Sequence, residues 1–209
     1  MTRAIRRDAM ASMSRRQCLT GLTALMVAGL AAAPAAALDA TIAKAHVQST
    51  LDEVLTLVRA PGEAAGKADA FRAILEKRAA MPQIARFAAG RLWNDMSADQ
   101  QERYTDAFTH YVSTVYARRF QEYSGQEVVL GQTRDKGRRG IEVASRVQGG
   151  GQPVVNVAWV VSDRPGRTVL ADIVIEGVSL AITQREEVAA IYGQQGNDPD
   201  KLIDFLKSI

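Results

Sequence analysis

Residues 169–182 read VLADIVIEGVSLAI, and this stretch decides the fold because it joins two kinds of periodicity. Its first half is apolar on both faces, as in a strand that is covered on more than one side. Gly177 then permits a sharp exit, and Ser179 can cap a helix that follows. The stretch therefore predicts that a sheet ends here and that helices resume after it.

Three further strands precede this stretch, joined by short turns. They read QEVVLGQ (126–132), IEVASRV (141–147) and VVNVAWVV (154–161), and the turns between the four strands read RDKGRRG, QGGGQP and SDRPGR. Strands that alternate with short Gly- and Pro-containing turns are typical of an antiparallel meander. We therefore expect a four-stranded meander that is covered on one face and partly covered on the other.

The faces of the last two strands follow from their alternation. In the third strand Val155, Val157, Trp159 and Val161 share one face. In the fourth strand, simple alternation puts Val169, Ala171, Ile173 and Ile175 on one face and Leu170 and Val174 on the other. The face with Val169, Ala171, Ile173 and Ile175 is expected to pack on helices or to line a cavity.

Helices are predicted both before and after the strands along the chain. Apolar residues recur at three- and four-residue steps in 42–60, 67–80, 82–90 and 98–123, and a capping box, Ser97 with Gln100, precedes the long fourth helix. Two more helices follow the sheet, one from Ser179 or Thr183 to Gly193 and one from Asp198-Pro199 onward. Helices, then a meander, then helices again predict one α+β domain over residues 38–209.

Residues 1–37 have the pattern of a cleaved signal peptide. A basic region with five arginines precedes the apolar run CLTGLTALMVAGLAAAPAAA, and cleavage is expected after Ala37. The sequence SRRQCLTG also resembles the twin-arginine export motif, so either export route fits. Cleavage removes five of the 26 Lys and Arg residues and one of the 23 Asp and Glu residues, which leaves a formal charge of −1. The basic charge of the full chain is therefore no argument that the protein binds nucleic acid. Cys18, the only cysteine, leaves with the signal.

Catalytic and metal-binding patterns are missing from residues 38–209. No nucleotide-binding, metalloprotease or serine-hydrolase motif occurs. Asp106 and His110 lie one helical turn apart and are expected to be a surface pair, and Asp172 and Glu176 are expected to be exposed or capping residues. The turn RDKGRRG is either a solvated loop or a surface for an acidic partner or anionic lipid headgroups. We expect no catalysis, no metal and no cofactor.

The long helix and the segment after the last strand carry a family resemblance. Trp93 with MSADQQ, the turn Tyr123-Ser-Gly-Gln126, the segment Asp172 to Ser179 with its Glu-Gly-Val-Ser, and the ending KLIDFLKSI are similar to those of the MlaC or toluene-tolerance family of periplasmic phospholipid carriers. The resemblance spans roughly residues 40–209. It implies a monomeric shuttle that holds acyl tails between sheet and helices. The implied partners are an outer-membrane lipoprotein complex and an inner-membrane complex of an MCE-domain protein with an ABC transporter.

The residues expected to line the apolar cavity come from the aromatic stripe of the long helix and from the sheet. They are Tyr111, Val115, Tyr116, Val143, Val157, Trp159, Ile173 and Ile175. Three alternatives stay open at this point. The ligand could be a hopanoid or another lipid, the domain could be an envelope adaptor without a ligand, or it could be an enzyme that uses Asp172 or His110 as a base.

Overall fold

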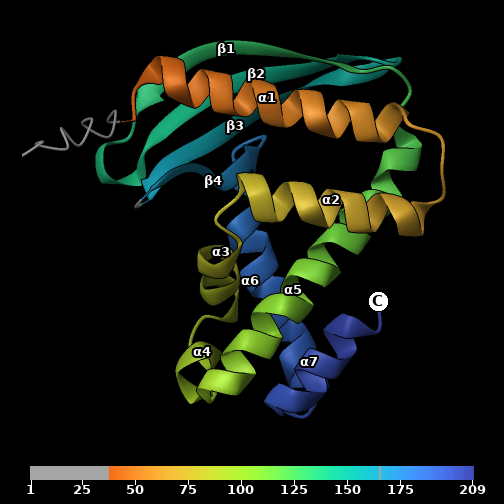
Figure 1. The fold of residues 1–209 in the computed structure, drawn as a ribbon, viewed down its shortest axis with the longest axis vertical. Coiled ribbons are helices and arrows are strands. Elements are labelled where there is room, and N and C mark those ends of the chain that lie inside the picture. Colours follow the sequence, from red (N-terminus) through yellow and green to blue (C-terminus); the bar gives the residue numbers. More distant parts are fainter. Residues whose placement is uncertain (1–37, 165) are drawn as a thin grey trace, which may run out of the picture. The chain divides into compact units, whose positions relative to one another are not determined.

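The computed structural model describes residues 38–164 and 166–209. The predicted signal peptide, its cleavage after Ala37 and the lone Cys18 lie outside the described residues. Within the described part the chain has the predicted α+β architecture, with helices before and after an antiparallel sheet (Figure 1).

Seven α-helices are present in the described residues. Five precede the sheet: α1 (Ala40–Arg59), α2 (Ala64–Arg78), α3 (Met81–Ala89), the unpredicted single turn α4 (Leu92–Asp95) and α5 (Ala98–Arg119). A 3-10 turn, η1 (Phe120–Glu122), extends α5, and α6 (Leu180–Gln194) and α7 (Pro199–Lys207) follow the sheet.

The predicted helix starts are confirmed. The Ser97 hydroxyl accepts from the Gln100 amide at 3.2 Å while the Gln100 side chain accepts from the Ser97 amide at 3.0 Å, which completes the capping box. Ser179, rather than Thr183, caps α6, and Asp198 caps α7. These side chains satisfy amides that have no partner inside the helix.

The sheet has five strands rather than the predicted four. Its order is β1 (Glu127–Asp135), β2 (Ile141–Gly149), β3 (Gln152–Arg164), β4 (Arg167–Ile175) and β5 (Val178–Ser179). The extra strand arises because Glu176 and Gly177 both take positive φ angles, 47° and 82°, which reverse the chain. Val178 and Ser179 then pair with Ile175 and Val174 along the edge of β4 before α6 begins.

A β-bulge corrects the predicted faces of β4. Val160 pairs with Asp172 but Val161 pairs with Leu170, so Ala171 is an extra residue on β4. A one-residue insertion moves every earlier side chain to the opposite face. Leu170 therefore shares the face of Ile173 and Ile175 and belongs to the core cluster, whereas simple alternation assigned that face to Val169.

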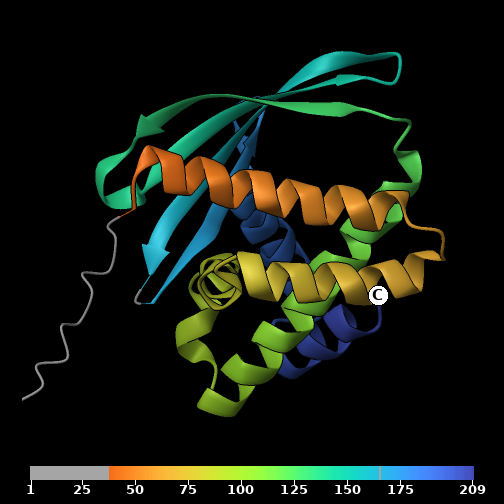
Figure 2. The same ribbon diagram turned by 45° about the horizontal axis from the view of Figure 1, so that its top comes forward.

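Helix α1 lies along one face of the sheet, and the other helices form a cluster that begins beneath its β4 edge (Figures 1 and 2). We call the sheet face that α1 covers the inner face. The core is continuous between sheet and helices, and its largest fully buried side chains are Tyr104, Phe108, Leu202, Ile203 and Leu206. No helix in the described residues is long and apolar enough to cross a bilayer.

Candidate functional site

The inner face of β2, β3 and β4 carries mainly apolar side chains. Strand pairing sets Val143 of β2 beside Trp159 of β3 and Trp159 beside Ile173 of β4. It also sets Val157 beside Ile175. The five sheet residues predicted from the sequence therefore do lie together on one face.

The apolar groove is an open hollow of about 780 Å³ between α1 and the inner face of the sheet. Its apolar wall combines one stripe of α1 with residues of η1 and the first three strands: Leu51, Val54, Leu55, Val58, Phe120, Val128, Val147 and Val155. Its volume falls within the roughly 300–1,000 Å³ that is usual for ligand sites, and its walls are of the hydrophobic kind that such sites prefer.

The wall on α1 follows directly from the sequence. Leu51, Val54, Leu55 and Val58 recur at steps of three, one and three, which is one face of an α-helix. Leu51 is buried, but the other three remain half-buried. Apolar side chains that face the fold and yet stay partly accessible mark a space that the protein's own side chains do not fill.

Cations and hydrogen-bonding groups form the rim of the groove. Arg59 donates to the Tyr123 hydroxyl at 3.2 Å, and that hydroxyl donates to the Gln126 carbonyl at 3.1 Å. Arg119, an exposed wall residue, lies with its guanidinium 5.3 Å from the centre of the Tyr116 ring. The rim thus carries Arg59 and Arg119 beside one acid, Glu122, and an apolar interior with arginines at its rim suits a ligand that has a hydrocarbon part and an anionic head.

A small apolar cavity lies deeper, between α5, α6 and β4. It has a volume of about 100 Å³, and its lining includes Val112, Tyr116, Phe108, Leu75, Ile84, Ile173 and Leu180. An apolar cavity of about 150 Å³ holds one benzene molecule, so this cavity as it stands is too small for an acyl chain. Burial among these side chains raises the pKa of Tyr116.

Three of the predicted lining residues lie between the two hollows. Along the inner face of β3, Val155 borders the groove, whereas Trp159 lies beside Ile173, which borders the cavity. Val157, Trp159 and Ile175 lie along this stretch of the sheet and border neither the groove nor the cavity. The Trp159 indole is anchored, because its Nε1 donates to the Ser145 hydroxyl at 2.8 Å.

The remaining predicted residues lie in the packed interior. Val143 is fully buried in the core, and the partly buried Val115 packs against this core cluster. The Tyr111 hydroxyl donates to Glu187 on α6 at 2.5 Å, and burial together with this carboxylate raises the Tyr111 pKa. Of the eight predicted residues, Tyr116 and Ile173 border the small cavity. A role in lipid contact stays a prediction for all eight.

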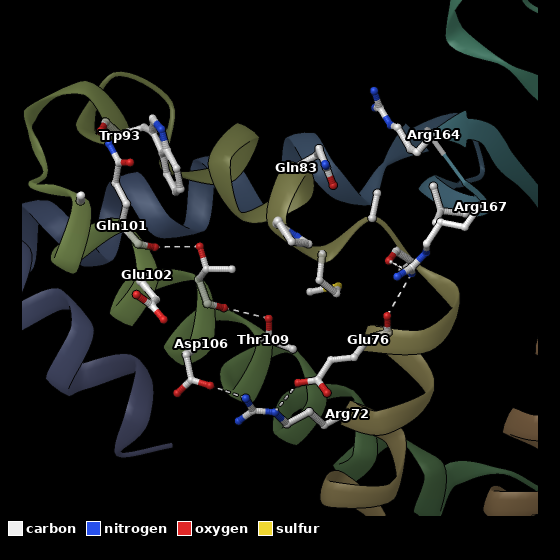
Figure 3. Close-up of a pocket in the computed structure, with 17 residues that line it drawn as sticks. Arg72, Glu76, Gln83, Trp93, Gln101, Glu102, Asp106, Thr109, Arg164 and Arg167 are labelled. Atoms are coloured by element: carbon white, nitrogen blue, oxygen red, sulfur yellow. Dashed lines mark hydrogen bonds and ion pairs between the residues drawn. The ribbon is translucent and has the colours of Figure 1, made fainter.

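The charged groove is a hollow of about 950 Å³ between α2, α3, α5 and the β3–β4 hairpin (Figure 3). Arg72 is held there between two carboxylates, Glu76 at 2.9 Å and Asp106, which hold its pKa above the usual range. Asp106 therefore pairs with α2 across the groove and not with His110, as the one-turn spacing had suggested.

Arg167 is also committed to the protein in this groove. Its guanidinium donates to the carbonyls of Glu76, Lys77 and Ala79 at 3.0–3.1 Å, so it caps the end of α2. The Ala80 amide donates to the Leu170 carbonyl at 2.8 Å and fixes the same end of α2 to β4. Figure 3 shows Arg167 turned toward α2 and Arg164 pointing away from it.

Asp172 has a capping role, as expected. Its carboxylate accepts from the Ile173 amide at 2.8 Å, the Ala181 amide at 3.0 Å and the Ser179 hydroxyl at 2.5 Å. A carboxylate with both oxygens engaged at a helix start serves that helix. Among residues 38–164 and 166–209 no three Asp, Glu, His or Cys side chains are grouped as a metal site would require.

The groove wall on α1 and η1 was not predicted as a site, although its stripe was recognised as apolar. The stripe continues from Val47 to Val58, whereas the structure buries only its first part, up to Leu51. A half-buried stripe and a fully buried one have the same sequence pattern, so periodicity alone does not separate them.

Comparisons with known proteins bear on this site. The family model described as MlaC protein matches residues 48–208, while no curated protein matches the chain significantly. A solved structure of the phospholipid-binding protein from Ralstonia solanacearum, in complex with a phospholipid, resembles the chain with a TM-score of 0.66. The two sequences are 24% identical over 79% of this chain and 95% of that chain, which indicates a shared fold.

Proposed function

The chain belongs to the MlaC family, and we propose that it is a periplasmic phospholipid carrier. In this proposal the acyl tails of the bound phospholipid occupy the apolar groove. The observation that carries this proposal is the groove itself, an open hollow of about 780 Å³ with apolar walls. The family resemblance first inferred from the Glu-Gly-Val-Ser segment and the Tyr-x-Gly-Gln turn agrees with the family match.

The energetics of lipid transfer require such a groove. Each methylene group removed from water contributes about 0.8 kcal/mol, so two acyl chains with roughly 30 methylenes would cost on the order of 20 kcal/mol to carry exposed. A patch on the surface of a small domain cannot cover that much hydrocarbon. In this proposal the tails enter between α1 and the sheet, where half-buried aliphatic side chains would contact them.

The headgroup belongs at the rim in this proposal. Arg119 and Arg59 supply guanidinium groups beside the opening, and guanidinium groups bind phosphate through paired hydrogen bonds. Longer tails would reach toward the small apolar cavity if Trp159 and its neighbours moved. The carrier would exchange lipid with an outer-membrane lipoprotein complex and with an inner-membrane MCE-domain and ABC transporter complex, and it would need no catalytic residue or cofactor.

The proposal is tested by filling the groove. The mature protein, purified gently from a bacterial periplasm, should carry a lipid mass in native mass spectrometry. Leu55→Trp should remove that mass and change the unfolding free energy by no more than about 1 kcal/mol, because the new ring enters open space rather than packed core.

Thr56→Trp is the matched control, since Thr56 is the next residue of the same helix and faces solvent. It should keep the lipid. If the wild-type protein carries no lipid and Leu55→Trp behaves like Thr56→Trp, the domain is an adaptor without a ligand. A lipid extract of the wild-type protein separates phospholipid from hopanoid.

A further inference from the structure

Four arginines gather at one end of the sheet. Arg134, Arg138 and Arg139 come from the β1–β2 hairpin and Arg164 from the β3–β4 hairpin, and all four are exposed. We name these four residues the basic end. We propose that the basic end is a docking surface for a protein partner that presents a cluster of carboxylates. This inference is independent of lipid binding.

The two hairpins are held side by side by a close backbone contact. A Cβ atom at Gly140 would lie 2.0 Å from the Val161 carbonyl oxygen and 3.0 Å from the Cα of Ser162. Gly140 also has a φ of 94°, which other residues rarely adopt. Only glycine therefore lets the first hairpin approach β3 this closely, and the approach brings Arg138 and Arg139 toward the strand that ends in Arg164.

The loop that carries Arg138 and Arg139 is hydrogen-bonded at each step. The Gly137 amide donates to the Asp135 carboxylate at 2.7 Å, the Gly140 amide donates to the Gly137 carbonyl at 2.9 Å, and the Lys136 amide donates to the Gly140 carbonyl at 2.9 Å. Lys136 forms an ion pair with Glu142 at 3.1 Å. A loop fixed in this way presents its arginines without a large ordering cost on binding.

The charge of the basic end is uncompensated. Within the described residues, none of the four guanidinium groups has an ion pair. Of the nearby acids, Asp135 and Glu142 serve the loop, and Asp163 beside Arg164 is exposed. Residues 134–140 and 163–167 together hold six basic and two acidic side chains, although residues 38–209 carry a formal charge of −1. Of these six, Lys136 is paired with Glu142 and Arg167 is bound to carbonyls of α2, which leaves the four arginines of the basic end.

The β1–β2 and β3–β4 hairpin turns lie at one end of the sheet and the β2–β3 turn at the other (Figures 1 and 2). The groove is bordered by Gly149, Gln152 and Pro153 of the β2–β3 hairpin, whereas the basic end surrounds the start of β2 at Ile141. Between Ile141 and Val147, strand β2 advances about 20 Å. A partner bound at the basic end therefore leaves the groove open.

The composition of the surface favours a protein over a bilayer. Membrane-surface segments combine basic residues with apolar side chains that enter the headgroup layer, but the exposed large apolar residues Phe87, Val154, Val178 and Ile182 all lie outside these two hairpins. Arg138 and Arg139 lie on the hydrogen-bonded loop, while Arg134 and Arg164 lie at the ends of β1 and β3. Arginine forms bidentate pairs with carboxylates.

The test uses the lipid-loaded mature protein and two probes, poly-L-glutamate and vesicles of phosphatidylglycerol and phosphatidylcholine. The variant Arg138→Gln, Arg139→Gln, Arg164→Gln should weaken binding to poly-L-glutamate by about tenfold at low salt. The matched control, Arg91→Gln, Arg146→Gln, Lys201→Gln, removes three exposed cations elsewhere on the domain. It should bind like the wild type.

Two outcomes would overturn the proposal. Equal loss in the control would show that affinity follows net charge alone. Selective loss of vesicle binding, with poly-L-glutamate binding unchanged, would assign the surface to a membrane. The lipid content by native mass spectrometry should be the same in both variants, so that failure of this proposal and failure of the carrier proposal are told apart.

Discussion

The charged groove and the apolar groove differ in the interactions that their wall residues already make. In the charged groove Arg72 is held by Glu76 and Asp106, and Arg167 is held by three backbone carbonyls. In the apolar groove Val54, Leu55 and Val58 face a space of about 780 Å³ and remain half-buried. The charged groove is larger, but its groups have partners.

This difference indicates that unmet interactions, rather than volume, mark a binding site. Ionic groups that are already paired stabilise the contacts between helices and strands, and a ligand would have to displace those pairs. Half-buried aliphatic groups gain about 25 cal/mol for each Å² that a ligand covers. Changes in the charged groove should therefore alter stability, and changes in the apolar groove should alter lipid content.

The larger of two stability effects is expected at Arg167. Arg167→Ala removes three hydrogen bonds from the end of α2 and should lower the unfolding free energy by about 1–2 kcal/mol in urea denaturation. Lipid content should stay unchanged. Arg164→Ala, the control across the same hairpin, points away from α2 and should cost less than about 0.5 kcal/mol. Lipid loss from Arg167→Ala at unchanged stability would make the charged groove a binding site and break the comparison.

A smaller effect is expected at Glu53, which lies on the helix that supplies the groove wall. Its carboxylate pairs with Arg78 and Lys77 of α2, both at 2.6 Å, and these bonds lower the Glu53 pKa to about 2. Because the folded pKa lies below the ordinary value of 4.5, the stabilisation is complete above about pH 4.5 and disappears as the pH falls toward 2.

Glu53→Gln should therefore cost about 1 kcal/mol at neutral pH, a small value because Lys77 is largely exposed. The variant should also lose part of the pH dependence of stability between pH 4.5 and 2. Urea denaturation at pH 7 and at pH 3 measures both. A stability difference between wild type and variant that is the same at both pH values would contradict the assigned role of this pair. Lipid content should not change.

Much of the fold could be predicted from the sequence because its signals are local. Ser97 with Gln100, Ser179, and Asp198 with Pro199 each act on the backbone within one helical turn, and all three mark helix starts in the structure. The change of periodicity after Gly125 likewise separates helices from sheet.

The rest depends on contacts between distant residues. The bulge at Ala171 and the edge strand β5 arise from pairing with β3 and β4, which alternation along one strand does not report. For the same reason Val143, Val157 and Trp159, which the sequence predicted to line a cavity, share one face of the sheet but do not border the apolar groove. How far a side chain is covered depends on where α1 lies on the sheet.

The central claim is that acyl tails occupy the apolar groove, and tail cross-linking tests it most directly. A phospholipid with a photoreactive diazirine near the end of one acyl chain would be loaded into the mature protein, irradiated, and the labelled residues identified by mass spectrometry. Label should fall on the groove wall, at residues 51–58 of α1 and 147–155 of the β2–β3 hairpin. Label on residues 101–109 and Arg164, along the charged groove, would contradict the account.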